Sequence, residues 1–464
     1  MKEKVWIKFY EGGVLREELT FIQAEERIKA KVAELSQLGI ENGDRVVIRL
    51  PNSPLCVITY LGIYRLGAVA VPVGLLEDQI RLNFIISDSG SKAIIDNSGI
   101  KILPLKSLNN KIKSVCTIIY TSGTTGTPKG VCLNWNNWVK NAESLIKHHH
   151  INENTVFASP LFLSHCNAHG LAMITTYISK CTWILFDKSP KNILEIISKE
   201  KVRILSVVPS ILYDIYNSNK NWKPNKELRY IITAAAPLSP DLLQSVMDTW
   251  KTRVIQGYGL SESTNFSCTM PTNLSEKVYK QVMFPWPSIG VALSGVKIKI
   301  GRKNKEEELG ELFISSKSNF SGYWNKDKIK LRPTIHTGDW GYYKTIARKR
   351  YFYFKGRIKE IINRGGEKIS PIELEYELRK NGLKGEFAII SLRSEKYGEE
   401  VGLAVCKHFD LSLIEKIPRY RRPKQVFLLK TLFYTPNGKL QRRKISEFCC
   451  NSKAEILINP DPLT

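Results

Sequence analysis

The feature that most constrains the fold is a regular alternation of short apolar runs with segments of helical periodicity, from about residue 20 to residue 270. The stretch 21–38, for example, spaces Phe21, Ile28 and Leu35 as on one face of a helix. Parallel strands need a crossover of a dozen or more residues, usually a helix, so this alternation predicts βαβ units. We therefore predict an α/β fold with one or two doubly wound sheets. The predicted strands are 45–50, 69–73, 92–97, 114–120, 182–186, 202–208 and 228–236.

The pattern changes near residue 285. Short strands separated by turn residues run from 289 to 356, with a Thr-Gly-Asp-Trp turn at 337–340, and predict a small β-barrel-like subdomain. Helices and strands then alternate again, which predicts a small α+β domain. A chain of 464 residues suits two or three domains of roughly 150 residues each. We predict a large domain over residues 1–356 and a small C-terminal domain over residues 357–464.

The net charge is the unusual part of an otherwise ordinary globular composition. Apolar residues make up 43% and charged residues 24%, which excludes a disordered or collagen-like chain. Lys and Arg number 69 and Asp and Glu 44, a net charge of +25. This excess favours an anionic partner or reflects the solvated surface of a lysine-rich chain. Because the basic residues are spread along the chain without a helix-turn-helix, zinc or RNP pattern, nucleic acid is disfavoured.

Cysteine usage and the terminal segments indicate the compartment. The nine cysteines contain no C-x-x-C pair, so we interpret them as reduced thiols. Lys8 and Glu11 interrupt the N-terminal segment, and no run of about 18 apolar residues occurs. We expect no secretory signal, no membrane span and a cytoplasmic protein. The run 148–150 of three histidines closes a predicted helix and is interpreted as a polar helix end rather than a metal site.

The most specific motif is the stretch 120–131, YTSGTTGTPKGV, directly after a predicted strand. A strand that feeds a glycine-rich turn can place backbone N–H groups around phosphate oxygens, and Gly123 and Gly126 allow close approach. Lys129 supplies a cation, but it follows Pro128 and precedes Gly130, so the motif is not Walker A. A solvated turn is the alternative. The hydroxyls that can donate to phosphoryl oxygens belong to Thr121, Ser122, Thr124, Thr125 and Thr127.

With five further motifs in order, the chain resembles the adenylate-forming superfamily of acyl- and aryl-CoA synthetases, stand-alone adenylation domains and firefly-type luciferases. The resemblance extends from about residue 20 to residue 445. It implies that a carboxylate attacks the α-phosphate of ATP to form an acyl-adenylate and pyrophosphate, and that a thiol or amine then takes the acyl group. The five motifs are TAAAPLS at 233–239, QGYGLSES at 256–263, HTGDW at 336–340, GRIKEIINRGGEKISPIELE at 356–375 and TPNGKLQRR at 435–443.

The resemblance implies an ATP site. Tyr258 corresponds to the aromatic residue that stacks on adenine, and Ala235–Pro237 to the wall on the other side. Asp339 corresponds to an acceptor for both ribose hydroxyls, although a turn aspartate often caps its own backbone. Arg357 corresponds to a ribose or phosphate contact. The implied ATP-binding residues are Thr121, Ser122, Gly123, Thr124, Thr125, Gly126, Lys129, Ala235, Ala236, Pro237, Gly257, Tyr258, Gly259, Ser261, Asp339 and Arg357.

Four residues are the candidates for catalysis. A carboxylate beside a triphosphate suits a bridging Mg²⁺, the implied role of Glu262, although a glutamate can simply begin a helix. Lys439 follows an Asn-Gly turn and would stabilise the negative charge that develops during adenylation, with a generic basic tail as the alternative. Thr125 and Lys129 from the phosphate loop complete the set.

Two further positions concern movement of the small domain. Lys359 corresponds to the family's hinge, and a solvated linker lysine is compatible with that role. Gly365 and Gly366 belong to a loop that resembles the family's thiol-transfer segment, where glycines permit close backbone approach.

The acyl pocket is less sharply indicated. His165, and with less support His169, are candidates for its gate, and Ala234 stands where the family has glycine. Members of this family that activate amino acids place an aspartate around 160–170 to pair with the substrate ammonium, and this segment has no acidic residue here, so the resemblance disfavours an amino acid. The extra methyl group of Ala234 disfavours a very long chain. We therefore expect a short- to medium-chain or aryl carboxylic acid.

The acceptor is predicted to be the thiol of CoA or the phosphopantetheine of an acyl-carrier protein. Between Lys416 and Lys444 lie ten Lys or Arg residues and no Asp or Glu, which suits an anionic partner. The alternative functions are a basic nucleic-acid-binding protein and a non-catalytic scaffold with the same fold.

Overall fold

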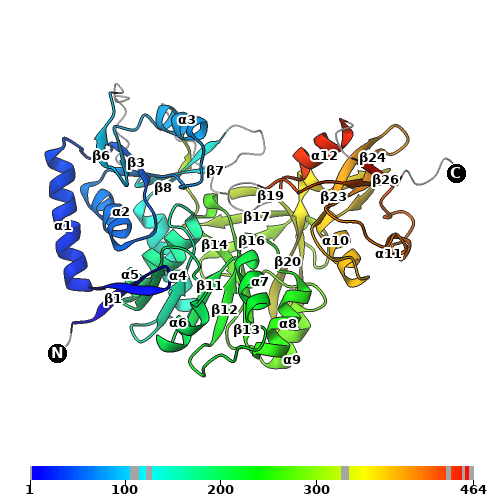
Figure 1. Ribbon diagram of the computed structural model, residues 1–464, viewed down its shortest axis with the longest axis horizontal. Helices are drawn as coiled ribbons and strands as arrows, with labels where there is room; N and C mark the ends of the chain where they lie inside the picture. Colours follow the sequence, from blue (N-terminus) through cyan, green and yellow to red (C-terminus); the bar gives the residue numbers. More distant parts are fainter. Residues whose placement is uncertain are drawn as a thin grey trace. The chain divides into compact units, whose positions relative to one another are not determined.

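The computed structural model describes residues 3–104, 114–121, 128–324, 334–434, 440–451 and 455–458 (Figure 1). The chain divides into two compact units. The first consists of residues 1–298, 313–335 and 346–351, and the second of residues 299–312, 336–345 and 352–464. The predicted small domain therefore lies within the second unit, which also takes in two earlier segments.

A seven-stranded sheet in the first unit confirms the predicted βαβ pattern. Strand β3 pairs in parallel with β4 on one side and β5 on the other, and β4 pairs in parallel with β7. Helix α2 (Pro54–Leu66) connects β3 to β4, and α3 (Gln79–Ser89) connects β4 to β5, while α1 (Phe21–Gln37) precedes β3. The sheet order is β18 (Gly322–Tyr323), β8 (Lys129–Leu133), β7 (Thr117–Thr121), β4 (Val69–Pro72), β3 (Arg45–Arg49), β5 (Ala93–Asp96), β6 (Gly99–Ile102).

A nine-stranded sheet forms the rest of the layered core of this unit. Its centre is parallel, but its edge strands β1 and β2 form an N-terminal hairpin that the sequence pattern did not predict. The order is β15 (Val291–Ala292), β14 (Phe266–Thr269), β13 (Arg253–Gly259), β12 (Tyr230–Thr233), β11 (Ile204–Val207), β9 (Val156–Ser159), β10 (Thr182–Phe186), β1 (Val5–Glu11), β2 (Val14–Thr20). Its helical elements are α4 (Trp135–His149), the π-helix η1 (Ala168–Ile174), α5 (Thr175–Ser179), α6 (Ile193–Lys199), α7 (Pro209–Ser218), α8 (Pro240–Trp250), the 3₁₀ turn η2 (Ser261–Ser263) and α9 (Glu276–Met283).

The strand order places a topological switch point in the nine-stranded sheet. From β9 the chain passes to β10 on one side and then to β11 on the other. In open α/β sheets, ligands bind outside the carboxyl ends of the strands at such a point. The segment 160–170, which follows β9 directly, therefore lies where this rule expects a ligand.

Local sequence signals explain where the helices begin and end. Thr20 accepts a hydrogen bond from the backbone N–H of Gln23, whose side chain in turn accepts from the backbone N–H of Thr20, so a capping box starts α1. Ser53 caps α2, Pro54 stands in its first turn, and Gly67 ends it in the left-handed conformation. These are the residue types that satisfy the unpaired backbone groups of helix termini.

A four-stranded sheet occupies the β-rich segment predicted after residue 285. Its order among the described strands is linear, and no barrel closure is seen there. The predicted turn at Thr337–Trp340 lies inside the long strand β19, where Gly338 has a φ of +67°. That expectation was wrong because glycine can take a left-handed conformation at a kink within a strand as well as in a turn. The strands are β16 (Val296–Ile300), β17 (Gly310–Ser316), β19 (Thr334–Ile346) and β20 (Lys349–Arg357).

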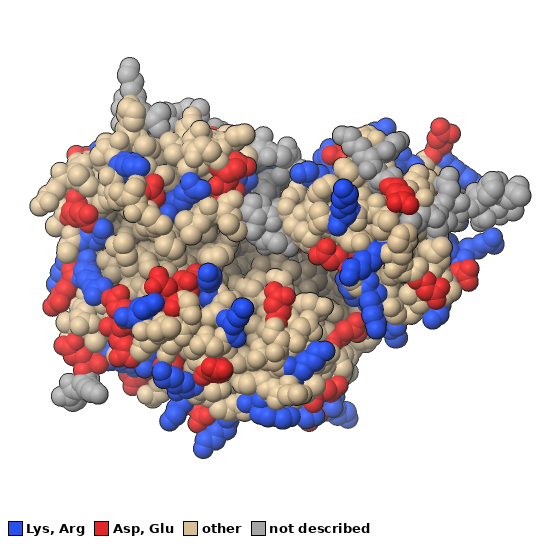
Figure 2. Space-filling model, viewed as in Figure 1, with Lys and Arg blue, Asp and Glu red and all other residues tan. Residues whose placement is uncertain are grey.

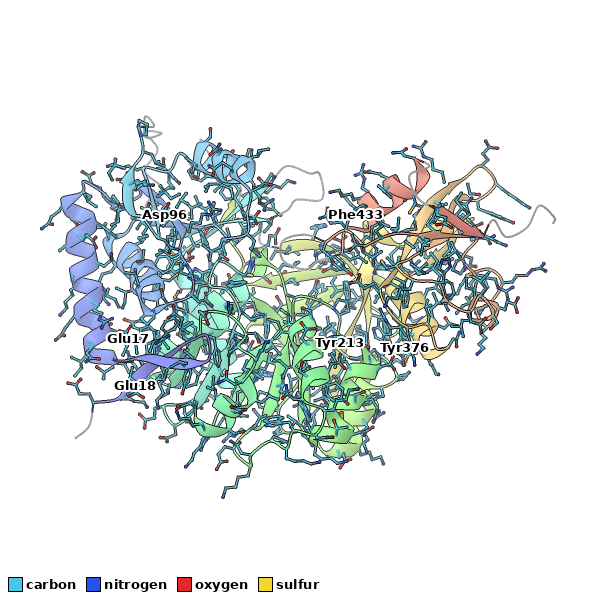
Figure 3. All side chains as sticks on the ribbon, in the orientation of Figure 1. Glu17, Glu18, Asp96, Tyr213, Tyr376 and Phe433 are labelled. Atoms are coloured by element: carbon cyan, nitrogen blue, oxygen red, sulfur yellow. The ribbon has the colours of Figure 1, made fainter. Side chains whose placement is uncertain are left out.

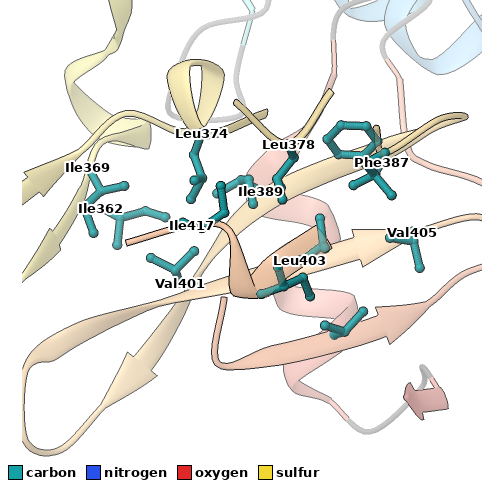
Figure 4. Close-up of a cluster of buried hydrophobic side chains, with 13 residues drawn as sticks. Ile362, Ile369, Leu374, Leu378, Phe387, Ile389, Val401, Leu403, Val405 and Ile417 are labelled. Atoms are coloured by element: carbon teal, nitrogen blue, oxygen red, sulfur yellow. The ribbon is translucent and has the colours of Figure 1, made fainter. Parts of the chain in front are cut away.

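The second unit contains a six-stranded sheet with its own apolar core (Figure 4). Leu374 and Leu378 of α10 belong to the same buried cluster as Ile389, Val401 and Leu403 from the sheet. A second cluster includes Ile445 of α12, and Phe433 packs against this cluster. Figure 3 labels Phe433 among the side chains of this unit. The elements are η3 (Ile358–Glu360), β21 (Ile362–Arg364), β22 (Glu367–Ile369), α10 (Pro371–Lys380), β23 (Phe387–Ser394), β24 (Gly398–Val405), α11 (Ser412–Glu415), β25 (Gln425–Leu428), α12 (Arg442–Cys450) and β26 (Glu455–Ile458).

Figure 2 shows the charged side chains on one face of the molecule. On the face drawn in Figure 2, basic side chains are interspersed with acidic ones. Among the described residues, no helix is both long and apolar enough to cross a membrane.

Candidate active site

Two segments predicted to hold adenine lie at the same edge of the nine-stranded sheet, one after β12 and the other at the end of β13. Strands β12 and β13 are parallel neighbours, with Thr233 opposite Gln256, so the segments that follow them lie side by side. The backbone N–H of Leu238 donates to Oε1 of Gln256 at 2.9 Å and ties the two together. Ala235–Pro237 is exposed at this edge, whereas Ala234 is buried. The structure thus brings these two predicted groups together.

Ala235 has a strained backbone. Its φ is +70°, in the left-handed region that residues with a Cβ seldom adopt. Such strain persists only where the surroundings impose it, and it gathers at ligand-binding sites. The short loop between β12 and α8 is therefore held in an unfavourable conformation at the position predicted to face adenine.

Gly257 and Gly259 on β13 are required by packing against β14. A Cβ on Gly259 would lie 1.7 Å from the carbonyl oxygen of Asn265, and one on Gly257 would lie 2.4 Å from the Phe266 ring. Tyr258 between them is half-buried and pairs with Cys268 across the two strands. The glycines permit the close strand approach that positions Tyr258.

We expect Gly259→Ala to destabilise the protein by about 3 kcal/mol or more, because the added methyl meets backbone rather than a movable side chain. Denaturant unfolding measures the loss. The matched control is Gly74→Ala, where the nearest atoms to a new Cβ are side-chain atoms at 3.6 and 3.8 Å. Equal stability of the two variants would contradict the packing argument.

The phosphate loop is anchored at both ends by an antiparallel pair. Thr121 at the end of β7 lies opposite Lys129 at the start of β8. Thr121 is half-buried and Lys129 is exposed. The structure therefore brings the two predicted end residues together. The predicted residues Ser122, Gly123, Thr124, Thr125 and Gly126 lie outside the described residues.

Glu262 lies in the 3₁₀ turn η2 and is linked to Lys129 by a residue that the motif analysis missed. The hydroxyl of Tyr323 donates to Oε1 of Glu262 at 2.8 Å. The ammonium nitrogen of Lys129 lies 5.7 Å from the centroid of the same tyrosine ring. Tyr323 follows Gly322 in a two-residue strand, and nothing in that short pattern marks it as a site residue.

The donor chemistry at Glu262 fits a magnesium ion. No group of three or more His, Cys, Asp or Glu side chains able to hold a metal ion is found within the described part of the chain. Mg²⁺ does not need such a group, since one or two carboxylates and the phosphate oxygens of a nucleotide bind it. Glu262, half-buried and oriented by Tyr323, is of the type required.

The segment after β9 contacts the loop that carries Glu262. The hydroxyl of Ser261 lies 3.7 Å from the sulfur of Cys166, next to the half-buried His165. The structure therefore places the predicted acyl-pocket segment beside a predicted ATP-binding residue, at the switch point of the sheet.

His169, the weaker candidate for a pocket gate, is a core residue. It is fully buried in the π-helix, with Nε2 2.6 Å from the hydroxyl of Tyr64 and its ring against Trp138. Burial lowers the pKa of His169 to about 3. The histidine run ends a helix as predicted, since α4 stops at His149 and His150 takes the left-handed conformation, but His149 itself is buried against Tyr230.

The buried His169 predicts acid sensitivity. Because its folded-state pKa is about 3 and a histidine in the unfolded chain titrates near 6.5, only the unfolded state gains this proton between those pH values. Stability is therefore lost as the pH falls from about 6.5 towards 3, by roughly 1.4 kcal/mol per pH unit from this group. Urea unfolding at several pH values gives the slope of the unfolding free energy against pH. Between about pH 3 and pH 6.5 this slope should be smaller in His169→Gln than in the unmodified protein by roughly 1.4 kcal/mol per pH unit, the contribution of one proton. The exposed His408→Gln is the control, and equal slopes in both variants would contradict the assignment.

The second unit contains the predicted ribose-binding pair. Asp339 is buried, and its Oδ1 lies 2.9 Å from Nε of Arg357. Its backbone N–H donates to the hydroxyl of Thr337, which donates in turn to the carbonyl of Leu312 at 2.8 Å. The structure thus brings Asp339 and Arg357 together, with the carboxylate paired to the guanidinium.

The remaining predicted residues of this unit occupy short turns. Lys359 is exposed in the 3₁₀ turn η3, directly after β20. Gly365 and Gly366, with φ of +56° and +97°, form the two-residue turn between β21 and β22. Lys439 lies outside the described residues.

The basic run 416–444 is partly neutralised by carboxylates from elsewhere in the unit. Arg442 is bound by Glu375 through both guanidinium NH groups, and its Nε lies 3.4 Å from Glu360. Burial alone would lower the pKa of Arg442, but these two glutamates raise it. Arg421 lies 3.1 Å from Glu377. The surface that contains this run therefore carries less net positive charge than the sequence of the run alone suggests.

Comparisons with known proteins show the family of the chain. The family model described as "AMP-binding enzyme" matches residues 3–115 and 103–324, more than half of the chain. An oxalate–CoA ligase of Arabidopsis thaliana is 26% identical over 92% of this chain and 93% of its own length. A long-chain-fatty-acid–CoA ligase of Mycobacterium tuberculosis is 27% identical over the same shares.

A solved structure shares the fold over nearly the whole length. The O-succinylbenzoate coenzyme A synthetase of Bacillus subtilis, in complex with AMP, superposes with a TM-score of 0.82 at 22% identity and covers 96% of this chain and 95% of its own. This likeness confirms the predicted α/β fold, and the family model confirms the predicted family. The family model matches most of the sequence, and the similarity to the named ligases covers more than nine tenths of each chain. The chain therefore belongs to the AMP-binding enzyme family.

Proposed function

We propose that the protein is an AMP-forming acid–thiol ligase that activates a carboxylic acid with ATP and transfers the acyl group to CoA. In the first step a carboxylate oxygen bonds to the α-phosphorus while the bond to pyrophosphate breaks. In the second, the thiol sulfur bonds to the acyl carbon, AMP leaves, and the thiol proton passes to solvent. The observation that carries the proposal is the link between Lys129 and Glu262 through Tyr323, beside the glycine-rich edge of β13.

The main predicted residues would have the following roles in this scheme. Lys129 would attract the phosphates, and Glu262 would hold Mg²⁺, which neutralises charge on them. Tyr258 would stack on adenine, and Asp339 would accept the ribose hydroxyls. Lys439 would stabilise the charge that develops during adenylation. Rotation at Lys359 and the turn at Gly365–Gly366 would serve thiol transfer.

We propose a short- to medium-chain or aryl acid as the substrate. The segment 160–170 follows β9 at the switch point and has no acidic residue that could pair with an ammonium group. Ala234 is buried and carries a methyl group where a glycine would leave more room. An ATP–pyrophosphate exchange screen over acids tests this. Exchange only with amino acids, or only with long-chain fatty acids, would refute the substrate class.

The acceptor is tested next with CoA and with an acyl-carrier protein. We propose CoA first, since the named relatives use it. A carrier protein is the second candidate, because Lys416, Arg419 and Lys430 are exposed on the second unit and a carrier is typically acidic. Thioester formation with the carrier but not with CoA would reverse this order.

A further inference from the structure

The segment Phe320–Trp324, here called the strap, is hydrogen bonded to both elements that carry the proposed phosphate-side groups. At one end, the backbone N–H of Phe320 donates to the carbonyl of Glu262 at 2.8 Å. At the other, the backbone N–H of Trp324 donates to the carbonyl of Gly130 at 2.7 Å. Between them, β18 pairs with β8, with Tyr323 opposite Val131. The strap therefore fixes the position of the Glu262 turn relative to β8, the strand that begins at Lys129.

Tyr323 contacts both charged groups with its side chain. Its hydroxyl donates to Oε1 of Glu262 at 2.8 Å, and its ring centroid lies 5.7 Å from the ammonium nitrogen of Lys129. A phenol hydroxyl is a donor to carboxylate, and the face of an aromatic ring attracts a cation. One half-buried side chain thus restricts a carboxylate and an ammonium that come from different elements.

We propose that Tyr323 is a positioning residue for the metal–nucleotide complex, acting on Glu262 through its hydroxyl and on Lys129 through its ring. The inference rests on the proposed function. A carboxylate held by one oxygen keeps its second oxygen in a fixed direction, as a single carboxylate–metal contact requires. A lysine held near a ring keeps its charge beside the phosphate loop instead of sampling solvent.

Two substitutions separate the two contacts. Tyr323→Phe removes the hydroxyl and keeps the ring, while Tyr323→Leu removes both. The control is Tyr177→Phe, since the half-buried Tyr177 donates to Oε1 of Glu25 at 2.5 Å far away in the sequence from either group. Circular dichroism and melting curves compare the folding of the three variants.

The measurements are the binding of Mn²⁺, by electron paramagnetic resonance, to the protein saturated with a non-hydrolysable ATP analogue, and the binding of that analogue in excess chelator. We expect Tyr323→Phe to weaken Mn²⁺ binding roughly tenfold and to leave metal-free nucleotide binding unchanged. Tyr323→Leu should also weaken metal-free binding about threefold, as expected for a lost cation–π contact at an exposed lysine. Tyr177→Phe should change neither.

Two results would overturn the inference. One is Mn²⁺ binding by Tyr323→Phe that equals that of Tyr177→Phe. The other is an undiminished tenfold effect of Tyr323→Phe in a Glu262→Gln background, since the tyrosine would then act without the carboxylate. Failure of the proposed function would look different. None of the acids tested would support ATP–pyrophosphate exchange by the unmodified protein, while the Mn²⁺ titrations would still decide the role of Tyr323.

Discussion

Replacing Lys439 by alanine is expected to slow acyl-adenylate formation by about 10²- to 10³-fold and to leave the binding of a preformed adenylate mostly intact. Negative charge develops on the carboxylate and the α-phosphate in the transition state, so a cation placed there lowers the barrier more than it tightens ground-state binding. Lys439 follows Asn437 and Gly438, a pair that favours a tight turn with the next side chain presented outward.

Pyrophosphate exchange and single-turnover adenylation measure the first step, and direct titration with a synthetic acyl-adenylate measures binding. Lys444→Ala is the matched control. It removes the same charge five positions further along, from an exposed side chain that lies 5.3 Å from the ring of Phe433. An adenylation rate in Lys439→Ala equal to that of Lys444→Ala would refute the catalytic role.

Substitution of Asp339 by asparagine is expected to lower kcat/KM for ATP by roughly 10²-fold, the cost of losing hydrogen bonds to a charged acceptor. The carboxylate is buried beside Arg357 and would accept from both ribose hydroxyls. The amide keeps the shape but replaces one acceptor by a donor and removes the charge. Steady-state kinetics with varied ATP, together with binding of AMP, measure the loss.

The control for Asp339 is Glu311→Gln. Glu311 accepts from the backbone N–H of Gly338 at 3.0 Å, next to Asp339, and glutamine retains an acceptor oxygen for that bond. Its substitution should leave the ATP dependence nearly unchanged. If both variants lose affinity equally, the effect comes from distortion of β19 and not from the ribose contact.

Many helices and strands of the first unit could be predicted from the local sequence pattern. The predicted helix over 21–38 and strand over 182–186 agree with α1 and β10, because amphipathic spacing and β-branched runs are local signals. The N-terminal hairpin was not predicted, since its outer strand is largely polar and is held by pairing with β1. The turn expected at 337–340 was wrong, because a glycine that kinks a strand has the same sequence signature as one in a turn.

The sequence by itself determined the class of fold and the family and predicted most residues of the proposed site, because ordered motifs and periodicity are properties of neighbouring residues. Only the tertiary structure decided which side chains touch. Tyr323 reaches Glu262 across 61 positions, and Arg442 reaches Glu375 across 67. The contact between Arg442 and Glu375 places a negative charge beside the basic run 416–444, which contains no acidic residue of its own. Such contacts follow from sheet order and strand register, which no local pattern of residues encodes.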